Sequence, residues 1–392
     1  MSNGPNPRRS PRQSMLRVSF DDEIFTAQFA GGASRVFCEL GEALADRPDI
    51  LPLVRFPLTA NRHLAASPVF RGHDLGRFQG VPGLRRLMRA LNRRAVFNAL
   101  DRGEADLVHA TWYDAELVER AGDIPVVMTV HDMIPELLPD PGLDSAHGAK
   151  LSVIPHADRI VAVSETTAAA LCRLTGLSRD AVRVIHHGVS DKLRWRPAEG
   201  RPSRLPETFL LFVGKRDGYK NFAGIAASVA QALRRDSAMH LVCVGGGTWR
   251  KNEIAEFERI GVARRVLQIE ADDRLLAACY AHAAAFLFPS LYEGFGLPLL
   301  EAMINRCPVI SSNGGALPEV AGEAALYFDP AQPEAIVDLV EGLSRDPARH
   351  SALVARGLRR AAHFSWDRAA AQYADLYREL AGQPGCLSAT PP

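Results

Sequence analysis

Two glutamates eight positions apart, Glu293 and Glu301, carry the clearest chemical signal in this chain. They stand in the stretch FPSLYEGFGLPLLE, which continues an apolar run that begins at position 283. That run, 283–288, has the length and flanks of a buried strand. We therefore expect the first carboxylate in the loop after a strand, and the second about one turn into the helix that follows. In an open parallel sheet such a loop lies at the carboxyl end of a strand, where ligands bind.

The residues between the two glutamates favour a sharp turn into a helix. Gly294 and Gly296 allow turns and close approaches that a side chain would prevent. Pro298 suits the first turn of a helix, which we expect to continue over 299–304. The unpaired N–H groups and positive dipole end of such a helix favour a phosphate. The alternative is that the glutamates are ordinary, one a loop carboxylate and the other a solvated helix residue.

A second glycine-led loop carries cations. Gly214 follows the expected strand 209–213, and Lys215, Arg216 and Lys220 come within the next six residues. Arginine can bind phosphate oxygens in a fork, and lysine acts as a point charge, so this loop suits a diphosphate. The alternative is a solvated basic turn.

A histidine follows the expected strand 125–130. His131 begins the hexapeptide HDMIPE, in which Asp132 and Glu136 could contact a donor or an acceptor. A histidine at the end of a parallel strand points into the crevice where ligands bind. A lone histidine there is more often structural, so the residues alone leave both readings open.

A glycine pair follows the first expected strand, 15–20. Gly31 and Gly32 form a backbone hinge before a helical period that begins at Arg35. A strand, a glycine pair and a helix could cradle a phosphate or a sugar, although such a pair is often only a turn. The segment lacks G-x-G-x-x-G, so we do not expect a dinucleotide site.

Several polar residues have ordinary structural explanations. Ser164, Asn221 and Asp272 each precede an expected helix and suit N-caps. Asp21-Asp22 fits a turn, and no pair of carboxylates stands on a loop suited to a divalent metal. His186-His187 would face opposite sides of a strand, so we expect no metal site.

The composition is that of an ordinary protein with two domains. The chain has 392 residues, of which 47% are hydrophobic, which is enough for two cores. Its net charge of +1 gives no electrostatic reason to expect nucleic acid. The six cysteines form no C-x2-C pair, so we expect reduced thiols in a cytoplasmic protein. No run of about eighteen uncharged apolar residues occurs, so no transmembrane helix is expected.

Strands and helices alternate in two series, which predicts two α/β domains. A disordered tail is expected at 1–14, a first domain at 15–194, a linker at 195–206 and a second domain at 207–365. A final helix is expected at 366–385. The expected strands are 15–20, 51–56, 106–110, 125–130, 159–163 and 182–185, then 209–213, 240–244, 266–269, 283–288, 308–311 and 326–328.

The clearest amphipathic pattern lies at 84–100, after residues 57–83, which show no period and are expected to form a long loop. Its apolar stripe is Leu84, Leu87, Met88, Leu91 and Ala95, and its arginines are Arg85, Arg86, Arg89, Arg93 and Arg94. One reading is a core-packed helix with a solvated basic face. The other is a face for anionic lipid or a lipid-phosphate acceptor, at the inner side of the cytoplasmic membrane.

Taken together, these motifs resemble the retaining glycosyltransferases of family 4, which have the GT-B fold. The stretch from Glu293 to Glu301 is similar to the family's E-x7-E signature. The HDMIPE loop resembles the loop in which a histidine touches the donor sugar. The segment GKRDGYKN, 214–221, is similar to the loop whose Arg and Lys neutralise the diphosphate. The resemblance covers residues 15–380 and is nearest to bacterial polysaccharide mannosyltransferases.

The resemblance implies a role for each motif. Glu293 and His131 would face the donor sugar, and Glu301 would hold the nucleotide ribose. Many relatives have Arg directly before the loop lysine, where this chain has Tyr219, so the role of the arginine would fall on Arg216, four positions before Lys220. The catalytic residues expected are His131, Glu293, Lys220 and Arg216. Donor binding would involve Gly31, Gly32, Gly214, Arg216, Lys220, Gly245, Asp272, Gly294, Phe295, Gly296, Leu297 and Glu301, and the acceptor side Asp132 and Glu136.

The expected fold is therefore α/β, with two doubly wound Rossmann-like domains facing a central cleft and a C-terminal helix crossing back to the first. The expected activity is hexosyl transfer from a nucleotide-diphosphate sugar, without cofactor or metal, to a glycan or lipid-linked acceptor. The resemblance to mannosyltransferases implies GDP-mannose or a related GDP-deoxyhexose as the donor. The alternatives are a UDP-sugar enzyme, a non-catalytic nucleotide-sugar-binding scaffold subunit, and a sugar phosphorylase or epimerase of the same architecture.

Overall fold

The computed structural model describes residues 15–70, 73–78, 80–138 and 150–382. The chain divides into two compact units. The first comprises Met1–Met128, His156–Asp158 and Ala370–Pro392, and the second Thr129–Pro155 and Arg159–Ala369. The expected tail at 1–14, residue Cys386 and positions 383–385 of the expected last helix lie outside the described residues. The domain limits expected at 194 and 207 stay a prediction.

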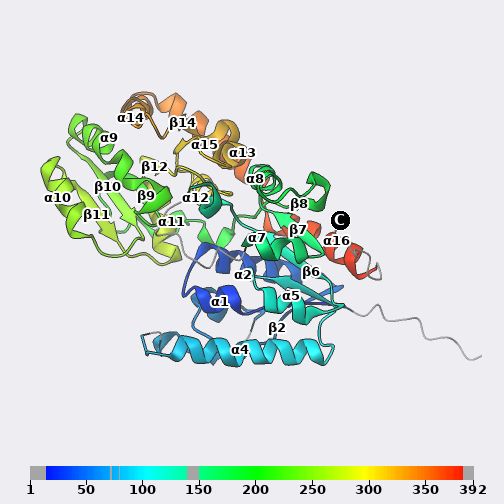
Figure 1. Cartoon of the computed structure of the whole chain (residues 1–392). Coiled ribbons are helices and arrows are strands. Elements are labelled where there is room, and N and C mark those ends of the chain that lie inside the picture. The colour runs from blue at the N-terminus through cyan, green and yellow to red at the C-terminus, as the bar shows by residue number, and fades with distance from the viewer. Residues whose placement is uncertain (1–14, 71–72, 79, 139–149, 383–392) are drawn as a thin grey trace, which may run out of the picture. The chain divides into compact units, whose positions relative to one another are not determined.

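The first sheet has six strands in the order β2-β1-β5-β6-β7-β8 (Figure 1). Their bounds are β1 (Leu16–Phe20), β2 (Ile50–Val54), β5 (Leu107–Ala110), β6 (Val126–Val130), β7 (Arg159–Ala162) and β8 (Val182–Val184). The pairs β1–β2, β1–β5, β5–β6 and β7–β8 are parallel. Each strand was expected from its apolar run, and no end differs by more than two residues.

The second sheet also has six strands, in the order β11-β10-β9-β12-β13-β14, and all of its pairs are parallel. Their bounds are β9 (Thr208–Val213), β10 (Met239–Val244), β11 (Val266–Ile269), β12 (Ala285–Phe288), β13 (Val309–Ser312) and β14 (Leu326–Phe328). These strands too lie where the apolar runs predicted them.

The helices of the described residues include all those expected, with further short ones. Their bounds are α1 (Glu23–Ala27), α2 (Gly32–Ala45), α3 (Arg62–Ala66), α4 (Leu84–Asp101), α5 (Ala115–Ala121), α6 (Ile134–Leu137), α7 (Lys150–Val153), α8 (Glu165–Thr175), α9 (Phe222–Arg235), α10 (Lys251–Arg259), α11 (Asp273–His282), α12 (Leu297–Ile304), α13 (Leu317–Ala321), α14 (Ala335–Arg345), α15 (Pro347–Ala361) and α16 (Trp366–Ala381).

Both faces of the second sheet are buried, as is usual for parallel sheets. Successive residues of a strand point to opposite faces. Phe209 and Leu211 accordingly belong to one apolar cluster, and Leu210 and Phe212 to another. Helices α11, α12 and α13 contribute to the first cluster, and α9, α10 and α14 to the second. The strands are therefore fixed between two layers of helices, and their ends are held in place.

The segment 57–83 is not the long loop that was expected. It contains two short paired strands, β3 (Leu58–Thr59) and β4 (His73–Asp74), as well as α3. The buried side chain of Asn92 on α4 donates to Leu58 O at 2.7 Å and accepts from Leu58 N at 3.1 Å. Asn61 caps α3. Strand β3 and helix α3 are thus held by the polar side chains of Asn92 and Asn61. Because such contacts produce no hydrophobic period, the sequence did not indicate these elements.

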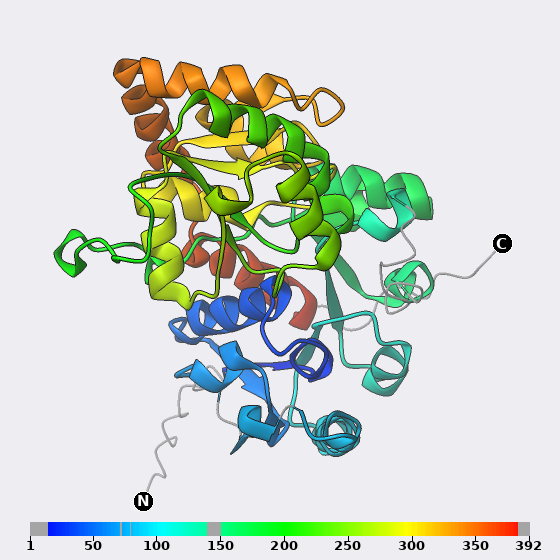
Figure 2. The same cartoon turned by 90° about the vertical axis from the view of Figure 1, so that its left-hand side faces the viewer.

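Helix α4 has the expected length but buries a different face. Met88, Asn92 and Val96 are buried, whereas Leu87 and Leu91, expected in the apolar stripe, are 56% and 45% exposed. The helix runs along the outside of the first unit in Figure 1 and is seen nearly end-on in Figure 2. Its buried stripe is centred on Asn92. Because Asn92 is polar, the pattern of apolar residues in the sequence did not indicate this stripe.

Three of the five arginines on α4 make contacts within the protein, although Arg85 and Arg89 remain exposed. Arg85 donates to the carbonyls of Thr26 and Ala27, and Arg89 pairs with Glu23 at 2.7 Å. Arg93 pairs with Asp114 and Glu116. These pairs attract the arginine side of the helix to α1 and α5 and leave the leucines outward.

From Ala370 onward, the C-terminal helix α16 packs in the first unit, as expected. Tyr377 Oη lies 2.7 Å from His109 Nδ1, and both side chains are fully buried. Arg378 pairs with Asp49 at 2.7 Å. The last helix is thus tied to the loop before β2 and to the centre of β5.

Candidate functional site

The order in which the chain adds strands to the second sheet reverses at β9. The chain leaves β9 and returns as β10 on one side, whereas β12 lies on the other side. In open parallel sheets, ligands bind outside the carboxyl ends of the strands at such a switch point. The loops that follow β9 and β12, residues 214–221 and 289–296, therefore define the candidate site.

A lysine and a glutamate from these two loops meet. Lys220 Nζ donates to Glu293 Oε1 at 2.6 Å, and Ser290 Oγ donates to the same oxygen at 2.6 Å. The Lys220 and Glu293 side chains are only 15% and 10% exposed, so solvent screens their attraction weakly. An ammonium group has three N–H donors, and this contact uses one of them. The pair can therefore hold its geometry and still offer positive charge to an anion.

Backbone contacts hold the Glu293 loop on two sides. Leu291 N donates to Tyr219 O at 2.7 Å, which joins the two loops of the site. Ala316 N donates to Glu293 O at 2.9 Å. A Cβ atom on Gly315 would lie 2.4 Å from the same carbonyl oxygen, so this approach requires glycine. The loop after β13 thereby packs directly on the Glu293 backbone.

The two glycines of the Glu293 loop are needed for different reasons. Gly296 has a φ of 103° and immediately precedes α12, so it supplies the turn that the sequence predicted. Gly294 is needed for space, because a Cβ atom there would lie 2.0 Å from the carbonyl oxygen of His131. The peptide after β6 therefore packs on the loop that carries Glu293.

Two hydroxyl groups with no predicted site role hold the same loop. Ser164 Oγ and Thr167 Oγ1 donate to Gly294 O at 2.7 and 3.0 Å. Ser164 Oγ also accepts from Thr167 N at 3.0 Å, which confirms its expected capping of α8. Only the cap has a sequence signature, because the other partner lies 130 positions away in the chain.

Glu319, which the sequence analysis did not single out, ties the start of α8 to α13. Its carboxylate accepts from Glu165 N at 2.8 Å and from Thr166 N at 2.9 Å, and lies 2.9 Å from His186 Nε2. Burial opposes ionisation, but the hydrogen bonds from His186 and the backbone outweigh it and lower the pKa of Glu319 to about 2. A fixed negative charge at a helix N-terminus is favourable.

The second glutamate of the pair, Glu301, lies on α12 and is 9% exposed, so it is not a solvated surface residue. Tyr280 Oη donates to its Oε2 at 3.0 Å. Burial, followed by the charge of Glu301, raises the pKa of Tyr280 well above its usual value, so the tyrosine remains a donor. The carboxylate is thereby held in one orientation.

Arg216 lies in a different environment from Lys220. It is 6% exposed, and its Nε donates to Glu253 at 2.8 Å. Its two terminal nitrogens donate to carbonyl oxygens of the loop 245–248 at 2.9–3.1 Å. The guanidinium also lies 4.2 Å from the ring centre of Trp249. A diphosphate would have to compete with these contacts, and the role expected of Arg216 stays a prediction.

The glycines around Arg216 adopt backbone conformations that other residues avoid. Gly245, Gly246 and Gly247 have φ values of 88°, 75° and 71°. A Cβ on Gly246 would lie 2.6 Å from Arg216 Nη1. Gly214, with a φ of 134°, lies against the side chain of Lys220. The glycines thus shape both cation positions, although a contact of Gly245 with a donor stays a prediction.

Three further residues expected at the donor site have local roles in the structure. Asp272 caps α11, as expected, through Leu275 N at 2.8 Å. Phe295 is buried, and Leu297 begins α12. Asn221 precedes α9 but does not cap it with its side chain, which donates to Pro289 O at 3.3 Å. That bond again joins the two loops of the site.

The HDMIPE loop follows β6, as expected. The His131 ring centre lies 5.6 Å from that of His187, and burial, followed by the neighbouring His131 and His186, lowers the pKa of His187. The two carboxylates expected on the acceptor side, Asp132 and Glu136, lie 3.8 and 3.1 Å from Lys150 Nζ. Both are thus engaged by a cation of the same unit.

Gly31 and Gly32 belong to the first unit, at the start of α2. Gly31 has an extended conformation, so the expected hinge does not rely on a left-handed residue. A Cβ atom on Gly31 would lie 2.2 Å from Gln28 Oε1, which accepts from Ser34 N at 3.2 Å. A Cβ atom on Gly32 would meet no heavy atom within 4 Å. A contact of either glycine with a donor stays a prediction.

The part of the chain that the structure describes has neither a cluster of possible metal ligands nor a helix that could span a membrane. Among those residues, no group of three or more His, Cys, Asp or Glu could hold a metal ion. No helix among them is long and apolar enough to cross a membrane. Cys38, Cys172, Cys243, Cys279 and Cys307 are free thiols.

Comparison with known proteins identifies the family of this chain. Residues 30–193 match the family model described as Glycosyltransferase Family 4, and residues 194–360 that described as Glycosyl transferases group 1. The chain is 30% identical to the O-antigen chain mannosyltransferase B of Escherichia coli over 65% of its own length and 70% of the relative's. It is also 30% identical to the D-inositol 3-phosphate glycosyltransferase of Rhodococcus opacus, over 70% and 68%.

The chain belongs to glycosyltransferase family 4. Among solved structures it is similar to Alr3699/HepE of Anabaena in complex with UDP, with a TM-score of 0.70 and 17% identity, over 93% of this chain and 100% of that one. This likeness confirms the expected GT-B fold, with two Rossmann-like parallel sheets and a C-terminal helix. The protein is thus an enzyme that transfers glycosyl groups.

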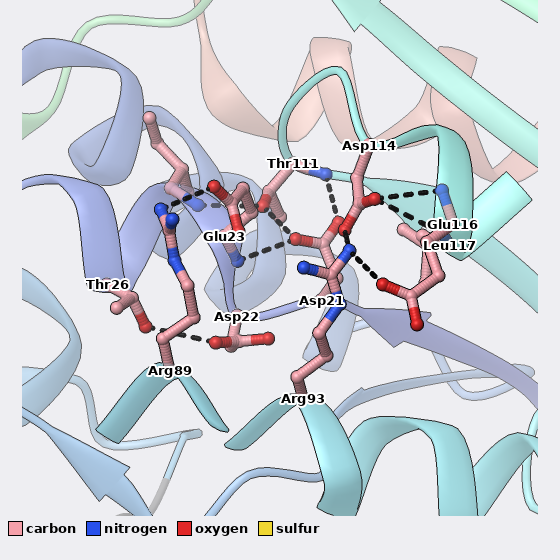
Figure 3. A network of polar contacts seen from close by, with 11 residues as sticks. Asp21, Asp22, Glu23, Thr26, Arg89, Arg93, Thr111, Asp114, Glu116 and Leu117 are labelled. Atoms are coloured by element: carbon pink, nitrogen blue, oxygen red, sulfur yellow. Dashed lines mark hydrogen bonds and ion pairs between the residues drawn. The ribbon is translucent and has the colours of Figure 1, made fainter. Parts of the chain in front are cut away.

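The first sheet of this glycosyltransferase has its own switch point, between β1 and β5. There the buried carboxylate of Asp21 joins the segments that follow β1 and β5. It accepts from Thr111 N at 2.5 Å, from Thr111 Oγ1 at 2.6 Å and from Glu23 N at 2.7 Å (Figure 3). Thr111 Oγ1 in turn accepts from Ile24 N at 3.2 Å. This network sets the start of α1 and hence the segment that leads to Gly31.

Burial decides the titration of the two aspartates in this network. It raises the pKa of Asp21 to about 7, although the hydrogen bonds from Thr111 and Glu23 oppose it. The pKa of Asp22 is raised to about 6, again by burial, and opposed by its bond from Thr26. Arg89 and Arg93 stand on the α4 side, where they pair with Glu23 and Asp114 (Figure 3).

These shifts predict that Asp21 contributes less to the stability of the glycosyltransferase as pH rises. A carboxyl whose folded pKa is about 7, against 3.8 when exposed, binds more protons in the folded state between those values. Stability contributed by Asp21 is therefore present at low pH and lost by about pH 8, with a slope of at most about 1.4 kcal/mol per pH unit. Calorimetric unfolding between pH 5 and 8 measures this slope.

The control compares two aspartate variants. Asp21→Asn is less stable, because an amide cannot accept from all three donors, but its pH slope is shallower than that of the parent. Asp46→Asn, at an exposed position, keeps the parent slope. Parallel slopes for the parent and Asp21→Asn would show that Asp21 does not titrate in this range.

Proposed function

We propose that the chain transfers a hexosyl group, mannose or a related deoxyhexose, from a GDP-linked sugar with retention of configuration. The acceptor is a growing glycan or a lipid-linked sugar in the synthesis of a cell-surface polysaccharide. The observation that supports this most directly is the contact of Lys220 with Glu293 at the switch point of the second sheet.

The geometry suits a leaving diphosphate. Lys220 supplies a partly buried positive charge, and the N-terminus of α12 supplies N–H groups and the positive end of a dipole. Both stabilise the negative charge that develops as the sugar–phosphate bond breaks, and neither requires a divalent metal. Glu301, oriented by Tyr280, lies one turn further on, where it would accept from the ribose hydroxyls.

In the proposed step, the bond between the anomeric carbon and the diphosphate oxygen breaks. An acceptor oxygen bonds to the same face of the sugar, and its proton passes to the departing phosphate. Glu293 and His131 belong to loops whose backbones touch at Gly294, so both would lie beside the sugar. This arrangement gives the protein the task of positioning and charge stabilisation.

The choice of GDP rests on the resemblance to mannosyltransferases and on the name of the Escherichia coli relative. The second relative is named for an inositol phosphate, and the solved structure holds UDP. We predict that GDP and GDP-mannose raise the unfolding temperature, and that UDP-, ADP- and dTDP-sugars do so less. At a hundred times its Kd, a ligand stabilises the folded state by about 2.7 kcal/mol.

Two variants test the roles within the site. Glu301→Gln loses most of the shift with free GDP, because the ribose contact is weakened. His131→Ala keeps that shift but turns over more slowly, because its proposed contact is with the sugar. A shift with UDP-sugars and none with GDP would overturn the donor assignment, and no shift with any nucleotide would overturn the proposal.

We also propose that the protein contacts anionic lipid through the outer face of α4. Because Arg85, Arg89 and Arg93 are engaged in the protein, this face differs from the one expected from sequence. It comprises the exposed Leu87 and Leu91, flanked at helical spacing by the exposed Arg86 and Arg94. Apolar side chains with flanking arginines fit an interface with acidic headgroups. Such a contact would bring the enzyme to a lipid-linked acceptor.

Flotation with vesicles tests this contact. We predict that the protein floats with phosphatidylglycerol vesicles at low salt and less with phosphatidylcholine alone. Arg86→Gln with Arg94→Gln should weaken partitioning about 30-fold, from about 1 kcal/mol for each arginine. Leu87→Ser with Leu91→Ser should weaken it as well, whereas Arg264→Gln, exposed on the second unit, should not. Binding that is absent, or unchanged in both double variants, would contradict the proposal.

A further inference from the structure

Lys150 is a buried lysine in the second unit that the sequence analysis did not single out. It begins α7, and its side chain is 0% exposed. Its Nζ donates to the backbone oxygen of Asp132 at 2.8 Å and to Glu136 Oε2 at 3.1 Å. Lysine is rarely buried unless its charge is paired, so these contacts explain why it is tolerated there.

The groups that Lys150 contacts belong to the loop that carries His131. Asp132 Oδ1, 3.8 Å from Lys150 Nζ, accepts from Ile134 N at 3.0 Å and so starts α6. Glu136 lies on α6 itself, and its side chain is 10% exposed. The lysine therefore binds the loop at its beginning and one turn later, which fixes the direction in which the chain leaves β6.

This loop packs against the Glu293 loop. The carbonyl oxygen of His131 lies so close to Gly294 that a Cβ atom there would be 2.0 Å away. Gly294 O is held from another side by Ser164 and Thr167. A line of contacts thus runs from Lys150 through the backbone at Asp132 to Gly294 and on to the neighbouring Glu293.

We infer that Lys150 is a positioning residue for glycosyl transfer, which holds the His131 loop against the Glu293 loop. Asp132 and Glu136 are then anchors of this loop and not ligands of the acceptor, in contrast to the expectation from sequence. This inference rests on the proposed function, because it assumes that His131 and Glu293 lie beside the sugar. Its structural part, the pairing of Lys150 with Glu136, does not depend on the reaction.

The first experiment measures the loop directly by hydrogen exchange. Lys150→Met keeps much of the side chain's length and removes its charge, which leaves Glu136 buried beside an apolar group. We expect faster exchange at 131–138 and at 289–296, with little change elsewhere in the second unit. The double variant Lys150→Met/Glu136→Leu leaves no unmatched charge and should recover most of the protection. Lys251→Met, at an exposed position on α10, is the matched control.

The second experiment separates positioning from folding. With GDP-mannose as donor, Lys150→Met should lower kcat more than tenfold while the Kd for free GDP, measured by calorimetry, changes less than twofold. The double variant should recover a large part of kcat. A loss of GDP binding in proportion to kcat, with no recovery in the double variant, would show a purely structural role and overturn the inference.

The remaining outcomes are also decisive. Unchanged exchange in Lys150→Met would overturn the inference whether or not any donor is used. If Lys150→Met does not fold, a folded double variant with parent-like exchange supports the pairing, and an unfolded one overturns it. If the parent transfers no sugar, the proposed function fails, yet the exchange data still test the pairing.

Discussion

The contact between Lys220 and Glu293 is the interaction on which the site depends. It joins the loops that follow β9 and β12, the two strands between which the second sheet reverses its order. A largely desolvated pair of this kind is stable only when its geometry is fixed and its other polar atoms are satisfied. Ser290 adds a second donor to the same carboxylate oxygen, and the Tyr219 carbonyl binds the loop backbone. These contacts hold the Lys220 ammonium and the Glu293 carboxylate together at the switch point of the second sheet.

The two sheets meet the same topological requirement with different chemistry. At the switch point of the second sheet, a glutamate is matched by a lysine that can also serve an anion. At the switch point of the first sheet, Asp21 is matched by the hydroxyl and N–H of Thr111 and by Glu23 N. The lysine–glutamate pair of the second sheet suits binding of a phosphate, whereas the Asp21 network of the first sheet suits fixing a loop. In the second sheet, glycines such as Gly294 and Gly315 then allow neighbouring loops to approach within backbone contact.

The sequence was sufficient for the sheets and for the motifs within single loops. Apolar runs located the strands because both faces of these parallel sheets are buried, and Gly296 and Pro298 marked the start of α12. Contacts between distant segments could not be read in this way. Neither Lys150 beneath the His131 loop nor Ser164 against Gly294 has a local pattern, and the burial of Asn92 turned α4 away from its apparent apolar stripe. The sequence indicated Arg216 as a cation of the loop after β9, but its contacts with Glu253 and the 245–248 loop follow only from the fold.

Calorimetric titration of free GDP into the Lys220→Met variant tests the central claim most directly. If Lys220 supplies the charge for the diphosphate, its loss removes a charge-assisted contact and weakens GDP binding by about 2 kcal/mol, or about 30-fold. Lys251→Met, which removes an exposed lysine of the same unit, should bind GDP as the parent does. A Lys220→Met variant that is folded and binds GDP with parent affinity would contradict the account, because the switch point would then hold a structural ion pair and not a phosphate site.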